Sequence, residues 1–361
     1  MINPLVSIAI PAYNAATDIR ATLQSVQAQT YRNFEAIVVD DGSTDATATI
    51  VEEFIAADPR FRLIRQRNTG IGGARNTAIR AARGVYIAPL DADDIVEPEK
   101  LEKQVECMER GGPDVGMVYC WNRRIDERGR YIGDGSPYTV EGRLRRALIL
   151  RNLFGGASVP LFRASALAAV GLYLTRADQH GGEGCEDWDL NLRVAERYLV
   201  RVVPEFLVLY RQRRDAISVN TTTMSTSYRA VFARAQQRSP DVPRALFRWG
   251  AGQFYIYLAN KSYQWGFYSR SLRMTIRASL SDPVLLLSRR VHRLAAASLL
   301  HLVTGGRFRR IAIASGTARP QPLTAKHGAP DLVERIQRRR FELACNGPES
   351  RTLPGFEAVH D

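Results

Sequence analysis

The chain has 361 residues, of which 45% are hydrophobic and 24% charged, values typical of a globular protein with roughly two domains. Its formal net charge is +13, which favours an anionic partner such as a phosphorylated substrate, a membrane surface or nucleic acid. The four cysteines lack zinc or redox spacing, the N-terminus does not resemble a signal peptide, and no apolar run reaches the ~18 residues of a membrane span. These features argue against a disulfide scaffold and an integral membrane protein, and we expect a reducing, cytoplasmic setting.

In the N-terminal quarter, short apolar runs alternate with helical patterns. The runs at 5–10, 34–39, 61–64 and 85–89 predict buried strands, and the patterns at 19–26, 50–55 and 74–83 predict the helices between them. Short connections between alternating strands and helices are typical of a parallel sheet covered on both faces. We therefore expect an α/β fold.

Polar side chains follow three of these predicted strands. Tyr13-Asn14 follows the first, Asp40-Asp41 the second, and Asp91, Asp93 and Asp94 the fourth. Parallel strands bring such ends to one edge of the sheet, where open α/β sheets bind ligands. Clustered carboxylates repel one another unless a cation holds them, and oxygen ligands suit Mg²⁺ or Mn²⁺. The alternative for the Asp-x-Asp-Asp cluster alone is a solvated acidic turn.

Further along the chain the pattern becomes less regular. A helix is expected from residue 97, a strand at 115–121, loops with an edge strand at 122–138, and helices at 144–153 and 164–171. Glycines at 181, 182 and 184 predict a mobile loop before a helix from Glu186 to Tyr198, and an apolar strand is expected at 202–210.

Four motifs occur in a characteristic order: Val6 to Asn14, Val38 to Asp45, Asn68 to Asn76, and Asp91 to Asp94. Together they resemble the family 2 glycosyltransferases, inverting enzymes with the GT-A fold that use nucleotide-sugar donors. The resemblance covers roughly residues 4–215. It implies a nucleotide-sugar donor, UDP- or dTDP-linked, and a glycan or lipid-linked acceptor.

The resemblance also implies roles for individual residues on the donor side. Pro11 and Tyr13 would line the base pocket, with Tyr13 stacking on the base, and Asp41 would accept a hydrogen bond from the base. Arg75 would lie near the diphosphate, Asp91 would position the nucleoside, and Asp93 would ligate the divalent metal, Mn²⁺ or Mg²⁺. The alternatives are that Tyr13 is a core aromatic residue and Arg75 a solvated helix residue.

On the acceptor side, Glu186-Asp187 matches the acid pair of the family, which implies that Asp187 is the catalytic base. A helix N-terminus lowers a carboxylate pKa, so substrate binding would have to raise it. The alternative is that Asp187 caps the helix. Glu186, Trp188 and Asp189 are left open between acceptor contact and packing. Gly155 and Gly156 would admit the acceptor sugar unless they form a plain turn.

Arg213 occupies a position where the family often has His near the metal or diphosphate. Arginine cannot ligate a metal but can pair with phosphate. The chain also lacks a Gln-x-x-Arg-Trp motif like that of processive polysaccharide synthases, so a single-transfer enzyme is expected.

The composition shifts after about residue 218. We expect a GT-A domain at 1–218, a helical basic region at 219–314 and a tail at 315–361. Within the middle region, 284–303 is predicted as one amphipathic helix with Arg289, Arg290, Arg293 and His301 on one side and Leu287, Val291, Leu294, Ala295, Leu299 and Leu302 on the other. Such a helix suits an anionic membrane surface on the cytoplasmic side, reinforced by basic residues at 305–310. The alternative is an ordinary helix whose apolar face packs internally.

Three features of the sequence bear on other functional classes. The cluster from Gly70 to Gly73 superficially resembles a dinucleotide fingerprint, but it follows the third predicted strand instead of the first. The net charge alone would fit a nucleic-acid-binding protein, an interpretation that the acidic strand ends disfavour. A sugar-nucleotide-binding protein without catalysis is the remaining alternative.

Overall fold

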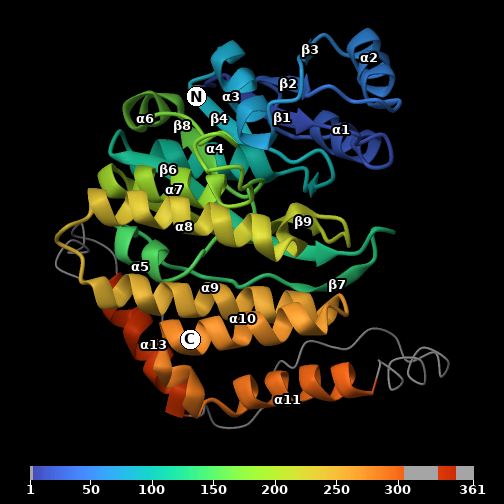
Figure 1. The fold of residues 1–361 in the computed structure, drawn as a ribbon. Helices are drawn as coiled ribbons and strands as arrows, with labels where there is room; N and C mark the ends of the chain where they lie inside the picture. Colours follow the sequence, from blue (N-terminus) through green and yellow to red (C-terminus); the bar gives the residue numbers. More distant parts are fainter. Residues whose placement is uncertain (1–2, 305–331, 347–361) are drawn as a thin grey trace.

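The structure is a computed structural model that describes residues 3–304 and 332–346. Its N-terminal part alternates strands and helices as the sequence predicts (Figure 1). The elements are β1 (Val6–Ala12), α1 (Ile19–Gln27), β2 (Phe34–Asp40), α2 (Thr47–Ala57), β3 (Phe61–Arg65), α3 (Ile71–Ala81) and β4 (Tyr86–Pro89). β1, β2 and β4 are buried along their whole length because helices cover both faces of the sheet. The predicted first and fourth strands each begin one residue too early, since Leu5 lies outside β1 and Val85, which is exposed, lies outside β4.

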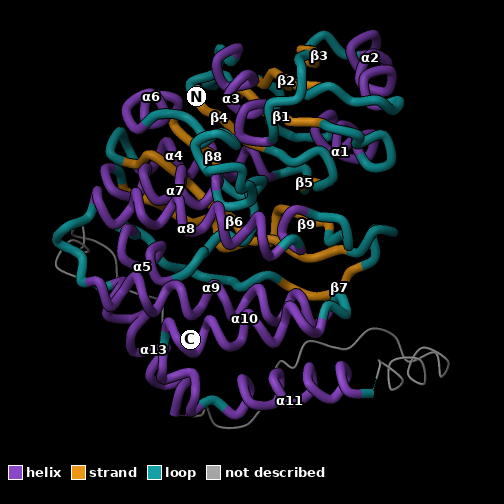
Figure 2. The backbone as a smooth tube through the Cα atoms, in the orientation of Figure 1, coloured by secondary structure: helices purple, strands orange, loops and turns teal. Residues whose placement is uncertain are grey.

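The described strands, which also include β5 (Ile95–Val96), β6 (Val115–Ile125), β7 (Tyr131–Asp134), β8 (Leu161–Arg163) and β9 (Leu199–Arg211), form one mixed sheet. Its order is β3-β2-β1-β4-β8-β6-β9-β5, with β7 added beside β6. The half built from β3, β2, β1 and β4 is parallel, as expected. β8 (Leu161–Arg163) runs antiparallel between β4 and β6, while β6 (Val115–Ile125) and β9 (Leu199–Arg211) pair in parallel. The α/β expectation is confirmed, and Figure 2 shows the strands flanked by helices.

The second half contains the remaining strands and the helices that pack on them. These are β5 (Ile95–Val96), α4 (Lys100–Gly111), β7 (Tyr131–Asp134), α5 (Arg145–Leu150), α6 (Ala164–Val170) and α7 (Glu186–Arg197). β6 continues past the predicted 121 because Asn122–Ile125 pairs with Val208–Arg211 of β9. β9 begins at Leu199, before the predicted 202, because its first residues pair with the start of β6 at Val115 to Val118. The sheet therefore extends under the region expected to be loops.

Helices follow the sheet in the C-terminal third: η1 (Ile217–Val219), α8 (Thr221–Arg238), α9 (Arg244–Gln264), α10 (Tyr268–Ser281), η2 (Pro283–Leu287), α11 (Arg289–Val303) and α13 (Leu332–Cys345). Figure 1 shows α9, α10 and α11 in the lower half of the molecule, with α8 above α9. None of the helices in residues 3–304 and 332–346 has both the length and the apolar character needed to cross a bilayer.

The predicted single helix at 284–303 is wrong in two respects. It is interrupted at Ser288 into the short η2 and the longer α11. His301 does not lie on the exposed basic side, because its ring stacks on Tyr268 with centroids 4.3 Å apart. Val291 and Leu294 are buried, whereas Leu287, Leu299 and Leu302 of the predicted apolar side are exposed. The basic residues expected at 305–310 lie outside the described residues.

Candidate active site

One cavity of about 1230 Å³ opens at the carboxyl ends of the central strands. It brings together all the candidate residues that the sequence singled out: Pro11, Tyr13, Asp41, Arg75, Asp91, Asp93, Gly156, Glu186, Asp187, Trp188 and Arg213. They come from β1, β2, α3, the turn after β4, the segment before β8, α7 and the residues after β9. This convergence is what a parallel sheet predicts for polar residues at its strand ends.

Arg75 is at the centre of a buried charge network. Its side chain is 2% exposed and pairs with Asp91 at 2.6 Å and with Glu186 at 2.8 Å. Burial opposes its charge, but the two carboxylates outweigh burial and raise the pKa of the guanidinium. The solvated-helix alternative for Arg75 is therefore wrong. Because Glu186 Oε2 also accepts from the Gly184 amide, the network fixes the start of α7 against α3.

Asp93 and Asp94 occupy very different surroundings. Asp94 is buried, accepts hydrogen bonds from the Ser158 hydroxyl at 2.6 Å and the Arg211 amide at 2.9 Å, and thereby holds three segments together. The Asp93 carboxylate faces the cavity, and no described side chain makes an ion pair with it. Burial, Asp91 and Asp18 together raise the pKa of Asp93 to about 7.

These surroundings fit a divalent cation at Asp93. A carboxylate whose charge is opposed by burial and by two acidic neighbours gains from a cation beside it. Within residues 3–304 and 332–346, no group of three or more His, Cys, Asp or Glu side chains is arranged to hold a metal ion. A metal at Asp93 would therefore need phosphate oxygens and water as its other ligands, as is usual for Mg²⁺.

Arg211 and Arg213 form a second charged cluster beside Asp93. Arg213 pairs with Asp18 at 2.5 Å and with Asp215 at 3.0 Å. Arg211 is buried, pairs with Asp18 at 3.3 Å and donates to the backbone carbonyl of Asp93 at 2.9 Å. Asp18 therefore draws both arginines to the rim of the cavity. Arg213 lies where phosphate pairing is feasible, because Asp215 is largely exposed and can exchange with another anion.

Asp41 has a structural role in addition to any contact with a base. Its carboxylate accepts hydrogen bonds from the Gln66 side chain, the Thr69 amide and hydroxyl, and the Gly70 amide, at 2.6 to 3.2 Å. A carboxylate offers about four lone-pair directions, so these four donors satisfy it. A bound base would have to displace Gln66 or the Thr69 hydroxyl. Tyr13, by contrast, is 53% exposed and free to stack, so the core-aromatic alternative is wrong.

Asp187 lies in the first turn of α7, where Cys185 occupies the N-cap position. The N-cap alternative for Asp187 is therefore wrong. Its carboxylate accepts only from the adjacent Trp188 amide among the described residues. Burial and the neighbouring Glu186 raise its pKa to about 7, against the lowering effect of Arg75. The expectation that the pKa falls until substrate binds is thus wrong in direction, because desolvation outweighs the helix terminus.

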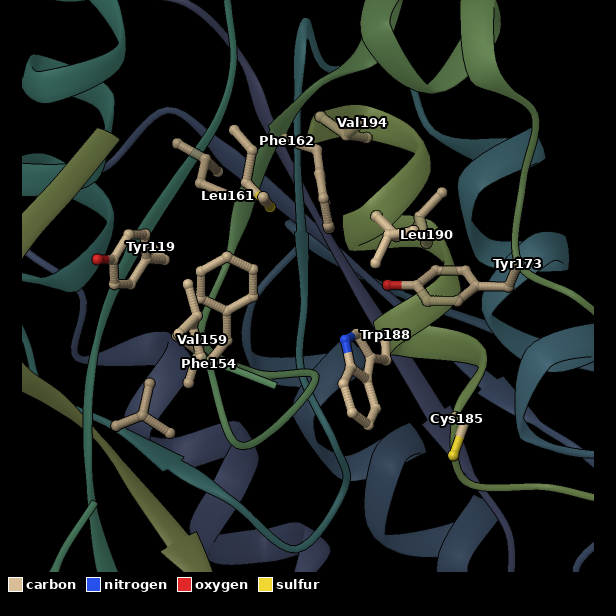
Figure 3. Packing of buried hydrophobic residues seen from close by; sticks show 14 of the residues in the cluster. Tyr119, Phe154, Val159, Leu161, Phe162, Tyr173, Cys185, Trp188, Leu190 and Val194 are labelled. Carbon is tan, nitrogen blue, oxygen red and sulfur yellow. The ribbon is translucent and has the colours of Figure 1, made fainter. Parts of the chain in front are cut away.

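Trp188 and Asp189 both make packing or ion-pair contacts in the described structure, and Trp188 also borders the cavity. The Trp188 indole donates to the Leu148 carbonyl at 2.8 Å and packs against Tyr228, Phe232 and Phe254. Figure 3 shows Trp188 and Leu190 projecting from α7 into the hydrophobic core. Asp189 is fully buried and pairs with Arg193 at 2.7 Å.

Gly155 has a φ of +71°, which favours glycine. Gly156 approaches the Tyr210 ring, which lies 3.6 Å from the position of a built Cβ. Both glycines border the cavity, so they leave space there that larger side chains would occupy.

Sequence reasoning missed several residues that organise the site. The sequence motifs assign no role to Asp18, Arg211 or Ser158. Ser158 accepts from the Asp91 amide and donates to Asp94. Asn76 exchanges hydrogen bonds with both backbone groups of Tyr173, whose ring lies 5.1 Å from the Arg75 guanidinium. Asn76 lies inside one of the four motifs, but the partners of both Asn76 and Ser158 are far away in the sequence, so local patterns do not reveal these contacts.

Comparisons with known proteins place this arrangement in a family. Residues 7–168 match the model for glycosyl transferase family 2. The chain is 38% identical over 197 residues to a chondroitin synthase of Escherichia coli, covering 54% of this chain and 27% of that protein. It is 31% identical over 215 residues to an uncharacterized glycosyltransferase of Methanocaldococcus jannaschii, covering 58% of this chain and 72% of that protein.

A solved structure extends the likeness to the fold. A mannosyltransferase from Pyrobaculum calidifontis, in complex with GDP-Man and Mn²⁺, superimposes with a TM-score of 0.55 at 20% identity and covers 88% of each chain. At this identity the likeness supports the GT-A fold alone, including the helices that follow the sheet. The family model and the relatives show that the chain belongs to glycosyl transferase family 2.

Proposed function

We propose that the protein transfers a sugar from a nucleotide-sugar donor to a hydroxyl group of a glycan or lipid-linked acceptor, with inversion at the anomeric carbon. One observation carries the proposal: a carboxylate suited to act as a base, Asp187, lines the same cavity as the Arg75–Asp91 pair and Asp93. A base with a pKa of about 7 is half deprotonated at neutral pH and strong enough to accept a proton.

The proposed step is a single displacement. The acceptor hydroxyl oxygen forms a bond to the anomeric carbon, and its proton passes to Asp187. The bond between that carbon and the diphosphate oxygen breaks, and its electron pair leaves with the nucleoside diphosphate. Asp187 is not paired with a cation in the described structure, so its lone pairs are available for the proton.

The donor side of the cavity must accommodate the diphosphate. Asp93 would hold the divalent metal, Mn²⁺ or Mg²⁺, together with phosphate oxygens, and the metal would supply charge stabilisation for the leaving diphosphate. Arg213 would add a second positive charge next to the diphosphate if its guanidinium released Asp215 and paired with a phosphate oxygen. Arg75 orients Asp91 through their 2.6 Å pair, so that Asp91 is held in place for the nucleoside.

Tyr13 and Pro11 form the proposed base pocket, with Tyr13 stacking on the base for ~1–3 kcal/mol. The nucleotide is proposed as UDP or dTDP, and the complex of the Pyrobaculum relative with GDP-Man makes GDP the first alternative to test. The acid-lined cavity argues against the nucleic-acid-binding alternative, since carboxylates at the site repel a phosphate backbone.

We also propose that residues 1–218 form the glycosyltransferase domain, and that the following helices bring it to the inner face of an anionic membrane. Leu286 and Leu287 of η2 are 54% and 62% exposed, and Arg289, Arg290 and Arg293 follow them with exposed side chains. Apolar side chains next to arginines are the combination that binds anionic bilayers. A tail at 315–361 completes the proposed division, mostly outside the described residues.

A thermal-shift panel tests the donor site. UDP, dTDP, GDP and their sugar conjugates are each added with Mn²⁺, Mg²⁺ or EDTA, because a ligand of the folded state raises the melting temperature. We expect a shift with one nucleotide family that requires metal and is lost in Asp93→Asn. The control is Asp114→Asn, which removes the same charge from an exposed residue outside the cavity. No shift with any nucleotide would contradict the proposal, and binding without turnover would favour a sugar-nucleotide-binding protein.

A further inference from the structure

Six arginines line the cavity in the described part of the chain, and they fall into two groups. Arg75, Arg176, Arg211 and Arg213 each pair with at least one carboxylate. Arg124 and Arg151 pair with none within residues 3–304 and 332–346. Their positive charges are therefore balanced by no acidic side chain of the described structure.

Arg124 and Arg151 bond only to neutral oxygens. Arg124 donates from Nη2 to the Asp134 backbone carbonyl at 2.8 Å, and its Nε is buried without a partner. Arg151 donates to the Tyr138 hydroxyl at 2.7 Å and to the Gln253 side-chain oxygen at 2.9 Å. The carboxylate of Asp134 lies beside Arg123 instead, at 3.7 Å. Donors left without anionic partners in a cavity favour an anionic ligand.

The wall behind them adds a third cation. Gln253, Tyr257 and Lys261 recur every four residues and so share one face of α9. Lys261 is buried and donates to the Ser218 hydroxyl at 2.5 Å and to the Tyr257 hydroxyl at 3.3 Å. Ser218 and Tyr257 both line the cavity. Lys261 thus raises the electrostatic potential at this wall without occupying the cavity itself.

This wall is separate from the proposed donor side. It is built by β6, the segments at 134–138 and 151–157, and α9, whereas the donor residues follow β1, β2 and β4. Tyr138, Tyr210 and Tyr257 line it together with the amides of Asn122 and Asn152. Aromatic faces with a few polar groups are usual for a pocket that holds an amphipathic ligand.

We propose that this wall, which we call the basic wall, selects an acceptor that carries a negative charge next to the sugar or polyol that receives the new bond. The charge is a carboxylate or a phosphate, and Arg124 and Arg151 bind it. The inference rests on the proposed transferase function and adds the chemical class of the acceptor. Because a guanidinium binds both anions through paired N–H groups, the structure assigns the shared chemistry and leaves the anion to the test.

The test uses the full chain with its donor side filled by the metal and the nucleoside diphosphate that gives the largest thermal shift. Two matched probe pairs are then titrated by calorimetry: glucuronate against glucose, and ribitol 5-phosphate against ribitol. We expect at least one anionic probe to bind roughly tenfold more tightly than its neutral partner, as a charged hydrogen bond implies. The preference is expected to weaken with salt.

Arg124→Gln and Arg151→Gln are each expected to remove most of this preference, while Arg151→Lys keeps part of it. Arg32→Gln removes the same charge from an exposed residue outside the cavity and is the matched control. Melting temperatures and the nucleotide-induced shift are measured for every variant, so that misfolding is separated from lost binding.

Two results would overturn the inference. One is equal binding of the anionic and neutral members in both probe pairs. The other is loss of the nucleotide shift in Arg124→Gln or Arg151→Gln, which would assign these arginines to the donor. Failure of every nucleotide to bind the wild type is a distinct result that contradicts the proposed function instead.

Discussion

At the scale of single residues, the partners of each carboxylate determine what it can do. Asp41, Asp94 and Glu186 are satisfied by hydrogen-bond donors and hold segments together. Asp93 and Asp187 lack a direct cationic partner among the described residues, and burial together with acidic neighbours raises the pKa of each to about 7. The motif residues therefore divide into structural carboxylates and carboxylates available for metal or proton.

The sequence predicts that these carboxylates lie close together in the fold. It does not predict which of them are structural and which are available for a metal or a proton. Their closeness is predictable because the carboxyl ends of parallel strands lie at one edge of the sheet. The pairing of Arg75 with Glu186 is not predictable, because it joins residues 111 positions apart. Whether Asp187 or Glu186 remains free depends on where that guanidinium lies. Local sequence contains no such information.

The raised pKa of Asp187 predicts a pH dependence. Protonation removes the base, so kcat/KM is expected to fall about tenfold per pH unit below pH 7 and to level off above it. The charged form is disfavoured in the folded state, so Asp187→Asn is expected to be more stable than wild type at pH 8, by an amount that shrinks as the pH falls from 7 to 4. A pH–rate profile and urea unfolding at pH 5 and 8 measure both effects. A flat rate profile between pH 5 and 8 would contradict the assignment.

Arg75 is predicted to be a stability residue as well as part of the site. Arg75→Met leaves Asp91 and Glu186 without their buried cation, and breaking such a pair costs about 3–5 kcal/mol. Urea denaturation measures the loss. The double variant Arg75→Met with Glu186→Gln is expected to recover part of it, because one uncompensated charge is removed. A decrease of less than about 1 kcal/mol in the free energy of unfolding would show that the network contributes little to stability.

At the scale of elements, α3 positions the segment that leads to α7. A Cβ at Gly72 would collide with the Leu174 carbonyl, so the segment lies directly against the helix. Asn76 clamps it through both backbone groups of Tyr173, at 2.8 and 2.9 Å. The start of α7, and with it Asp187, thus depends on one side of α3.

Asn76→Ala is expected to loosen this segment without unfolding the sheet. Hydrogen exchange should become faster at residues 172–176, because the Tyr173 amide loses its buried acceptor, and kcat should fall more than donor affinity. The control is Asn260→Ala, because the Asn260 side chain donates only to the Ile256 carbonyl within α9. Unchanged exchange at Tyr173 would rule out the clamp.

Element prediction succeeded where a pattern was local. The four parallel strands of the first half were predicted to within a few residues because continuous apolar runs rich in β-branched residues mark buried strands. The antiparallel insertion of β8 and the extension of β6 beside β9 follow from tertiary pairing, which periodicity does not reveal. The break at Ser288 was missed because apolar residues continue on both sides of it.

At the scale of the whole molecule, the C-terminal helices complete the cavity that the sheet begins. α9 supplies one wall, and Phe341 of α13 packs against Tyr138 at the rim, with ring centroids 5.4 Å apart. Asp282, fully buried after α10, pairs with Arg340 at 2.7 Å and fixes α13. The helical region therefore shapes the wall of the cavity that we propose for the acceptor.

The membrane proposal predicts binding to anionic vesicles that declines with salt. Basic residues near an anionic leaflet contribute ~1 kcal/mol each. Replacing Leu286 and Leu287 by serine is expected to reduce flotation with phosphatidylserine vesicles severalfold, and Val85→Ser, an exposed apolar residue before β4, is the control. Equal flotation with neutral and anionic vesicles, or no effect of the leucine substitutions, would exclude this surface.

We propose above all that Asp187 is the general base for sugar transfer from a nucleotide donor bound in the same cavity. The most direct measurement is release of nucleoside diphosphate from the donor identified by thermal shift, with and without an acceptor pool, in wild type and Asp187→Asn. We predict acceptor-dependent release that falls by about 100-fold or more in the variant, on the scale of lost general-base catalysis, while donor binding is retained. Release by Asp187→Asn at the wild-type rate would contradict the proposal.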